Sequence, residues 1–326
     1  MRTAAEHLKA GNLVAFPTET VYGLGADATN EVAVAKIYAA KARPTDHPLI
    51  VHIPSMQSMG EWGSDIPEFA VTLARDFWPG PMTLIVKRSE YAANFITGGQ
   101  DSVGLRVPNH PIALALLEAF EKTGGKGIAA PSANRFGQVS PTTAGAVIEE
   151  LGEYLGEDDI ILDGGACEVG VESTIIDCTG DIPRIMRPGA VSDDMVAAST
   201  GLQIFRTYRF VYDSDAGISI VPPEHIRVSG SHENHYAPKA KVYLDQQAIA
   251  GQGFIAHANI ETPPGVIRLA SPRDDEEFAN ILYSALREAD AQGLSGVVVM
   301  QPIGRGIAVA IRDRLLRAAA GSDSRQ

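Results

Sequence analysis

Cations and hydroxyl groups recur in this sequence where apolar runs of strand length end. The cations are Lys41, Arg43, Arg106 and Arg187, and the hydroxyl-bearing residues are Thr20, Ser132, Ser140 and Ser173. Guanidinium and ammonium groups pair with carboxylates and phosphates, and hydroxyls add hydrogen bonds to the same ligands. Because open α/β sheets bind ligands at strand ends, the pattern predicts a site for anionic ligands with no evident nucleophile.

Lys41 and Arg43 follow a helix-like stretch and precede the strand-like run LIVHI. Cations at a helix end also complement the helix dipole, so a structural role stays open for both. Two prolines stiffen the segment between helix and strand, which favours a fixed clamp for a polyphosphate. His47 and His52 flank the strand, and a lone histidine is more often a satisfied polar group than a ligand.

Arg106 lies in GLRVP, an otherwise apolar strand, where a charge needs either an acidic partner or a ligand carboxylate. The sequence leaves both readings open. Residues 16–25, FPTETVYGLG, and residues 129–134, AAPSAN, follow or end strands with small and polar residues, which let a ligand approach the backbone but also fit ordinary turns. Ser140 with Pro141 predicts a helix N-cap, and the free N–H groups of such a helix start attract anions.

Composition and missing motifs narrow the function. Lys+Arg 27 against Asp+Glu 40 gives a net charge of -13, which disfavours extended binding to nucleic acid but still allows ATP to bind a local cluster of cations. The motifs GxxxxGK[ST], GxGxxG after a strand and GxSxG are absent, which argues against the commonest nucleotide folds. Cys167 and Cys178 show no metal-ligand spacing, so we expect no metal-binding residues.

Apolar runs alternate with helix-like stretches up to about residue 205, which predicts an α/β domain with a covered sheet. Thr3 and Glu6 predict a capping box for its first helix. Residues 206–240 show no strong period and predict a linker or covering loop, and residues 241–326 predict a smaller α/β domain with a helix capped by Ser271. With no leader pattern and no long apolar run, we expect a cytoplasmic protein without a membrane span.

The motifs PTETVYGLG, KARPTDHPLIVHI, GLRVP, PSAN, SPT, ESTIID and MRPG follow one another in this order. Together they resemble the YrdC-type threonylcarbamoyl-AMP synthases, and HYAPK with the second domain resembles the long, two-domain form of that family. The resemblance implies a YrdC-like twisted-sheet catalytic domain with a concave cleft in residues 1–205, a linker or lid in 206–240, and a smaller Rossmann-like α/β C-terminal domain in 241–326.

The resemblance also implies a nucleotidyltransferase that makes threonylcarbamoyl-AMP and pyrophosphate from L-threonine, bicarbonate or CO2, and ATP. Mg²⁺ would accompany ATP, and a downstream transferase would use the product to modify tRNA. L-Threonine would be held by Thr20, His52, Arg106, Ala130 and Ser173. ATP would be held by Arg43, His47, Ser102, Ser132, Ser140, Arg187 and Tyr236. Lys41 and Arg43 would supply the catalytic charge near the phosphates.

The length of the linker and the stiff unit around Tyr236 predict a lid over the cleft, although a passive tether is the alternative. The linker departs from the family pattern, because SGSHEN stands at residues 229–234 where a Pro-Gly pair and an aromatic and a basic residue are usual. Two other functions stay open: an RNA-binding module that uses a cationic cleft, and a carbamoyl transferase that adenylates carbamoyl phosphate. The second of these would be expected to carry zinc-type cysteine clusters and a longer chain.

Overall fold

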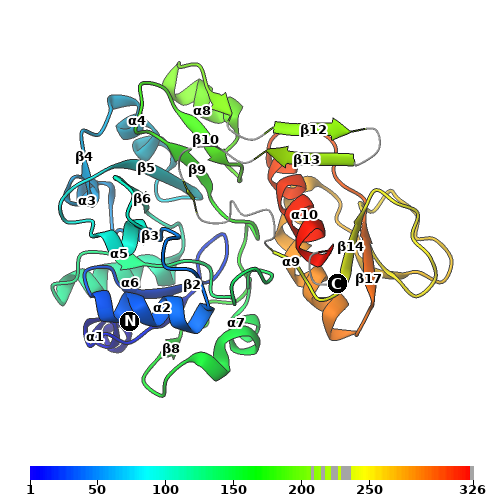
Figure 1. The fold of residues 1–326 in the computed structure, drawn as a ribbon, viewed down its shortest axis with the longest axis horizontal. Helices are drawn as coiled ribbons and strands as arrows, with labels where there is room; N and C mark the ends of the chain where they lie inside the picture. The colour runs from blue at the N-terminus through cyan, green and yellow to red at the C-terminus, as the bar shows by residue number, and fades with distance from the viewer. Residues whose placement is uncertain (207–208, 214–216, 222–226, 229–235, 324–326) are drawn as a thin grey trace.

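The computed structural model describes residues 1–206, 209–213, 217–221, 227–228 and 236–323. The unusual linker run at residues 229–234 lies outside the described residues. In Figure 1 the first 206 residues form one body, and the residues from 241 onward form a second, smaller body beside it.

A mixed, twisted sheet forms the centre of the larger body. Its strands are β1 (Val14–Phe16), β2 (Gly23–Asp27), β3 (Ile50–His52), β4 (Gly63–Ser64), β5 (Met82–Arg88), β6 (Ser102–Arg106), β7 (Ile128–Ala129), β8 (Ile160–Ile161), β9 (Thr174–Asp177), β10 (Arg184–Arg187) and β11 (Phe205–Arg206). They pair in the order β11-β10-β9-β5-β6-β3-β7-β2-β1-β8, and β4 pairs with β5. Because β3 and β6 run parallel with His52 opposite Arg106, two predicted site residues lie at matching ends of neighbouring strands.

Helices pack around this sheet. They are α1 (Arg2–Lys9), α2 (Glu31–Lys41), α3 (Met59–Trp62), α4 (Glu68–Phe77), α5 (Asn94–Thr97), α6 (Pro111–Lys122), α7 (Ala144–Leu151) and α8 (Asp193–Thr200), with the short 3-10 turns η1 (Met56–Ser58) and η2 (Gly152–Tyr154). In Figure 1, α1, α2 and α6 lie at one end of the body, and α4 and α8 lie at the opposite end. Leu8 of α1 and Phe120 of α6 share one buried apolar cluster with Phe16 of β1, which fixes the strand that precedes the motif FPTETVYGLG.

The starts of α1 and α7 correct two expectations from the sequence. Helix α1 begins at Arg2, so Thr3 lies inside the helix and forms no capping box. Helix α7 is capped by Thr143, whose side chain accepts from the Ala146 amide, and Ser140 therefore lies before the helix and is not its cap. These caps were misassigned because a Ser or Thr before an apolar run fits a cap equally well at several positions.

The smaller body is an α/β domain with a parallel sheet. Its elements are β14 (Lys241–Leu244), β15 (Gly253–Ile255), β16 (Ile267–Ala270), α9 (Asp275–Ala291), β17 (Gly296–Val299) and α10 (Ile307–Asp323). The strands pair in the order β14-β17-β15-β16. Helix α9 is capped by the Asp274 side chain, which accepts from the Glu277 amide, so the predicted Ser271 cap is also wrong.

The segment between the two bodies contains an antiparallel hairpin of β12 (Arg209–Asp213) and β13 (Gly217–Val221), which the sequence did not reveal. Figure 1 shows the hairpin beside α10. The two bodies also share one buried cluster, in which Val21, Val139 and Val171 of the first pack with Tyr283 and Leu315 of the second and with Tyr236 of the connecting segment. The predicted fold class, a twisted-sheet α/β domain followed by a smaller α/β domain, is confirmed.

Candidate active site

A cavity with a volume of about 50 Å³ lies between the ends of β3, β6, β7 and β9 and the segment before β14. The residues predicted from the sequence that line it are Arg43, His52, Arg106, Ala130, Ser132, Ser173, Arg187 and Tyr236. Thr18 and Glu172 also line it. The sequence therefore identified most of the polar lining, although residues from eight separate segments supply it.

Arg106 is held by a buried carboxylate. Its Nη2 atom lies 2.8 Å from Glu19 Oε1 and donates to the Thr20 hydroxyl at 2.9 Å. The other oxygen of Glu19 accepts from the Asn109 amide at 3.1 Å. The sequence left open whether Arg106 pairs with an acidic side chain or with a ligand carboxylate, and the structure shows the acidic side chain. Arg106 still lines the cavity, so a ligand carboxylate can bind to the same guanidinium.

His52 faces Arg106 from the neighbouring strand and is buried. Burial, and after it the positive charge of Arg106, lowers the pKa of His52 to about 3. The ring packs edge-on against Phe16, with 5.8 Å between the ring centroids, and Nδ1 has no hydrogen-bond partner among the described residues. His52 is therefore a neutral side chain with a nitrogen available to a polar ligand.

The start of β9 and the end of β10 form a second cationic wall. Arg187 donates through Nε and Nη2 to the Ser173 carbonyl, at 3.1 Å and 2.9 Å, and through Nη2 to the Ser173 hydroxyl at 3.2 Å. The same hydroxyl lies 2.8 Å from the Thr83 hydroxyl of β5. Two strands are thus joined at the cavity, and the Arg187 guanidinium and the Ser173 hydroxyl are both held in place.

Lys41 and Arg43 take different positions at the end of α2. The Lys41 ammonium is buried and donates to the carbonyls of Ser132, at 2.6 Å, and Asn134, and burial together with nearby Arg43 holds its pKa well below the usual value. Arg43 lines the cavity, donates to the Pro48 carbonyl at 3.0 Å and has its pKa lowered to about 10 by burial, so it remains charged at neutral pH. The α2 end thus contributes Arg43 to the cavity wall and uses Lys41 to hold the Ser132 backbone.

Ala130 and Ser132 extend the wall beyond β7. The Ala130 amide donates to the Ile50 carbonyl at 2.9 Å, and Ser132 forms an isolated bridge with Gly23. A Cβ atom on Gly23 would lie 3.3 Å from the Ala130 Cβ, so the glycine allows the two segments to approach closely. Such close backbone packing leaves room for a ligand between small side chains.

The second body contacts the cavity wall at Glu172, a residue of the first body. This buried carboxylate accepts from the Ser140 hydroxyl at 2.6 Å, from the Tyr283 hydroxyl at 2.9 Å and from Arg314 Nε at 2.7 Å. Burial alone would raise the pKa of Glu172, but the charges of Arg314 and Arg187 hold it below the usual value. Tyr236 stacks on Tyr283 with 5.7 Å between ring centroids, which places the predicted lid residue against the cavity.

This arrangement suits the binding of anions better than covalent catalysis. Three buried guanidinium groups, those of Arg43, Arg106 and Arg187, line one cavity. Burial raises the pKa of the Cys167 thiol to about 12, so this side chain is no thiolate nucleophile at neutral pH. Fixed cations around a closed site can orient two anionic reactants and neutralise charge that develops between them.

Comparison with known proteins identifies the family. A family model described as "Telomere recombination" (Sua5, YciO and YrdC) matches residues 6–189, and one described as "Threonylcarbamoyl-AMP synthase, C-terminal domain" matches residues 203–320. The threonylcarbamoyl-AMP synthase of Pyrococcus abyssi is 39% identical over 98% of this chain and 93% of its own length. That of Bacillus subtilis is 37% identical over 98% of this chain and 92% of its own length. The crystal structure of P. abyssi Sua5 complexed with L-threonine superposes with a TM-score of 0.84 at 36% identity, covering 98% of this chain and 94% of that one.

The chain belongs to the threonylcarbamoyl-AMP synthase family. This confirms the resemblance inferred from the ordered motifs.

Three of the residues assigned by family resemblance lie just behind the cavity wall. Thr20 contacts Arg106, Ser140 contacts Glu172, and Lys41 contacts the Ser132 carbonyl. His47 lies outside the set of lining residues and packs on Phe136, with 5.2 Å between ring centroids. Their contact with a ligand stays a prediction.

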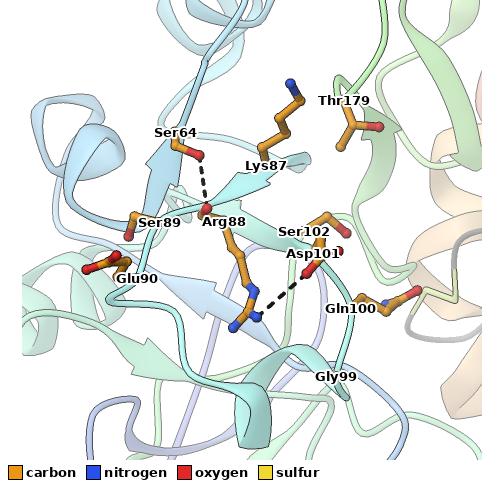
Figure 2. Close-up of a pocket in the computed structure, with 10 residues that line it drawn as sticks. All are labelled: Ser64, Lys87, Arg88, Ser89, Glu90, Gly99, Gln100, Asp101, Ser102 and Thr179. Atoms are coloured by element: carbon orange, nitrogen blue, oxygen red, sulfur yellow. Dashed lines mark hydrogen bonds and ion pairs between the residues drawn. The ribbon is translucent and has the colours of Figure 1, made fainter.

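Ser102 lies in a separate, wide pocket at the ends of β5 and β6, which Figure 2 shows. There the cations already have partners, since Arg88 lies 3.6 Å from Asp101, and Lys87 lies 3.5 Å from Asp65. Ser102 also borders a smaller hollow that contains Ile50 and Thr83, between this pocket and the cavity. The assignment of Ser102 to ATP stays a prediction.

The sequence reasoning missed the acids and the second-domain residues of the site. Glu19 and Glu172 stand within the motifs PTETVYGLG and ESTIID, so a signal was present in the sequence. Tyr283 and Arg314 lie on α9 and α10 and gave no signal, because their contacts with Glu172 depend on how the two domains pack.

Proposed function

We propose that this chain is a nucleotidyltransferase that makes threonylcarbamoyl-AMP and pyrophosphate from L-threonine, bicarbonate or CO2, and ATP, for threonylcarbamoyladenosine formation in tRNA. The observation that carries the proposal is the cavity lined by the buried guanidinium groups of Arg43, Arg106 and Arg187, in a chain that matches synthases of this name over nearly its whole length. Both substrates that must meet there, a carbamate and a triphosphate, are anions.

The threonine would bind at the β3 and β6 end of the cavity. Arg106 would pair with its carboxylate while Glu19 and Thr20 hold the guanidinium in place. The neutral His52 and the hydroxyl of Ser173 would contact the polar groups of the amino acid, and Ala130 would leave space for its side chain. The P. abyssi structure with L-threonine supports a threonine site in this fold.

The triphosphate would bind between Arg43 and Arg187, with Ser132, Ser140 and Tyr236 around it and with Ser102 and His47 toward the adenosine side. The threonine amine attacks CO2 and loses a proton, which gives a carbamate. A carbamate oxygen then attacks the α-phosphorus, the bond from the α-phosphorus to the bridging oxygen breaks, and pyrophosphate leaves. Arg43 and Arg187, with Lys41 behind them, neutralise the charge that grows on the leaving group.

Magnesium fits this site as a companion of ATP. Within the described ranges, no group of three His, Cys, Asp or Glu side chains could hold a metal ion. The carboxylate of Glu172 is occupied by Ser140, Tyr283 and Arg314. Because Mg²⁺ usually keeps several waters and binds substrate phosphates, we propose that it enters with the triphosphate.

Several wider assignments belong to the same proposal. The product would pass to a downstream transferase that modifies tRNA, and the work would be divided among a catalytic domain of residues 1–205, a linker or lid of 206–240 and a C-terminal domain of 241–326. No helix in the described part of the chain is long and apolar enough to cross a membrane. We expect a cytoplasmic location.

An RNA-binding module is less well supported. The cavity cations are buried, with Arg106 and Arg187 each 4% exposed, whereas a phosphate backbone needs an accessible basic surface. The net charge of -13 also opposes such binding.

Product analysis tests the proposed function. We expect mass spectrometry to find threonylcarbamoyl-AMP after incubation with L-threonine, bicarbonate and ATP, and pyrophosphate release to need all three. Serine should react poorly, because loss of one methyl contact costs roughly 1 to 3 kcal/mol. Equal pyrophosphate release without threonine would overturn the proposal. It would also be overturned if the chain made no threonylcarbamoyl-AMP and instead bound RNA strongly, with an affinity that falls steeply as salt is added.

A further inference from the structure

Arg314 is the largest charged side chain of the second domain that is completely buried, at 0% exposure. From α10 it reaches into the first domain, where Nε lies 2.7 Å from Glu172 Oε2 and Nη2 donates to the Pro188 carbonyl at 3.0 Å. Its Nη1 is paired with Asp313 of its own helix. One guanidinium thus holds both the carboxylate on the cavity wall and the backbone directly after Arg187.

The charge of Glu172 creates a problem for a site that binds anions. Its carboxylate lines the same cavity as Arg43 and Arg187, and Glu172 is only 6% exposed. A buried negative charge close to a triphosphate would repel it strongly, because screening by solvent is weak in such a place. Arg314 provides the opposite charge from the far side of the carboxylate.

A second arginine between the domains offers a comparison. Arg287 of α9 lies 3.0 Å from Glu150 of α7 and donates to the Val139 carbonyl, so it also joins the two domains. Neither Arg287 nor Glu150 lines the cavity. If Arg314 only joined the domains, the two arginines would have the same effects when removed.

We propose that Arg314 is a positioning residue for the nucleotide side of the site: by neutralising and orienting Glu172, it makes the C-terminal domain part of the ATP-binding site. The inference rests on the proposed function, since it takes ATP as the ligand. It gives the C-terminal domain a role in binding ATP.

The first test compares Arg314→Met with Arg287→Met in calorimetric titrations of the full chain with ATP and, separately, with L-threonine. We expect Arg314→Met to weaken ATP binding by about tenfold or more, equivalent to one charge that is no longer compensated, and to change threonine binding by less than about threefold. Arg287→Met should change both affinities equally and by less than about threefold. Circular dichroism of each variant shows whether it is folded.

The second test restores the charge balance. The double variant Arg314→Met/Glu172→Gln removes the charge together with its partner and keeps an acceptor for the Ser140 hydroxyl, so we expect ATP affinity within about threefold of the original. Glu172→Gln alone should bind ATP at least as tightly as the original chain. This single variant decides the matter if Arg314→Met does not fold, because a loss of ATP affinity beyond about threefold in Glu172→Gln would overturn charge compensation.

A pH series adds a readout that a purely structural link would not change. The groups that face Glu172 are Ser140, Arg187 of β10, Tyr236, Tyr283 of α9 and Arg314 of α10. Without Arg314, burial would raise the pKa of Glu172, and a lower pH would then neutralise it. The ATP affinity of Arg314→Met should therefore approach that of the original chain as the pH falls from 8 to 6.

The inference would be overturned if the ratio between the ATP affinities of Arg314→Met and the original chain stayed constant from pH 8 to 6. Equal losses of ATP and threonine affinity in Arg314→Met would also overturn it. Either result would leave the proposed function intact. The proposed function has its own test, because it fails if the original chain makes no threonylcarbamoyl-AMP whatever the variants bind.

Discussion

Arg106 shows at the scale of single residues how a charge can be buried and still be available to a ligand. Glu19 compensates the charge, and the Thr20 hydroxyl and the Gly80 carbonyl accept hydrogen bonds from N–H groups of the same guanidinium. The sequence indicated the cation, because an arginine in an apolar strand needs a partner. It could not choose between an acidic partner and a ligand, because the contact with Glu19 depends on how the segment between β1 and β2 packs against the end of β6.

Removing Arg106 should separate its two tasks. Arg106→Met is expected to lower the free energy of unfolding by roughly 3 to 5 kcal/mol, because Glu19 stays buried without its partner. In Arg106→Met/Glu19→Gln much of this stability should return, but threonine binding should stay weaker by roughly 2 to 5 kcal/mol. Urea unfolding and calorimetry measure the two effects. Threonine binding at original strength in the double variant would show that Arg106 only compensates Glu19.

His52 should make the folded chain less stable in acid. Its folded pKa of about 3 lies below the usual value of 6.5, so the unfolded chain binds a proton more readily and stability falls as the pH drops from about 6.5 toward 3. His52→Gln should lower the slope of the free energy of unfolding against pH by up to about 1.4 kcal/mol per pH unit, which corresponds to one proton. Urea unfolding at a series of pH values checks the slope, and an unchanged slope would contradict a neutral, buried His52.

At the scale of elements, strands were easier to predict than helix starts. The apolar runs around His52, Arg106 and Arg187 all became strands whose ends meet at the cavity, because burial on both faces leaves a clear apolar pattern. Ser140 was misassigned as a helix cap because its hydroxyl donates to Glu172 instead. A local rule cannot foresee that a hydroxyl will find a stronger partner from another element.

The turn after β10 depends on Gly189. A Cβ atom there would lie 2.3 Å from the Thr174 amide nitrogen and 2.7 Å from the Ser173 carbonyl carbon, so Gly189→Ala must displace the start of β9. We expect a loss of roughly 1 to 3 kcal/mol in stability and weaker binding of both ATP and threonine. Gly180→Ala, in the turn between β9 and β10, is the control, because nothing lies within 4 Å of its Cβ, and it should change stability by less than about 0.5 kcal/mol. Equal effects of the two substitutions in thermal unfolding would refute this account of the turn.

For the whole molecule, the sequence predicted two α/β domains but treated the segment between them as a linker without regular structure. The hairpin β12–β13 and the shared cluster of Val21, Val139, Tyr236 and Tyr283 show a closer connection. The cluster could not be foreseen, because its members are ordinary apolar residues of each domain until the two surfaces pack. Glu172 and Arg314 add a buried ion pair to the same interface.

A chain shortened to residues 1–205 tests whether the second domain is a passive attachment. We expect this fragment to lose stability, since the cluster residues Val21, Val139 and Val171 become exposed at roughly 1.5 to 3 kcal/mol for each fully exposed side chain. We also expect it to lose synthesis, because Tyr236 is absent and Glu172 keeps neither Tyr283 nor Arg314.

The matched control is the full chain cleaved at a protease site inserted after residue 213. The two pieces should remain associated through the buried interface, and the complex should remain active. Urea unfolding and adenylate production measure both outcomes. Undiminished synthesis by the fragment would show that residues beyond 205 serve only as a tether, and loss of activity in the cleaved chain would show that an unbroken linker, and not the packed interface, completes the site.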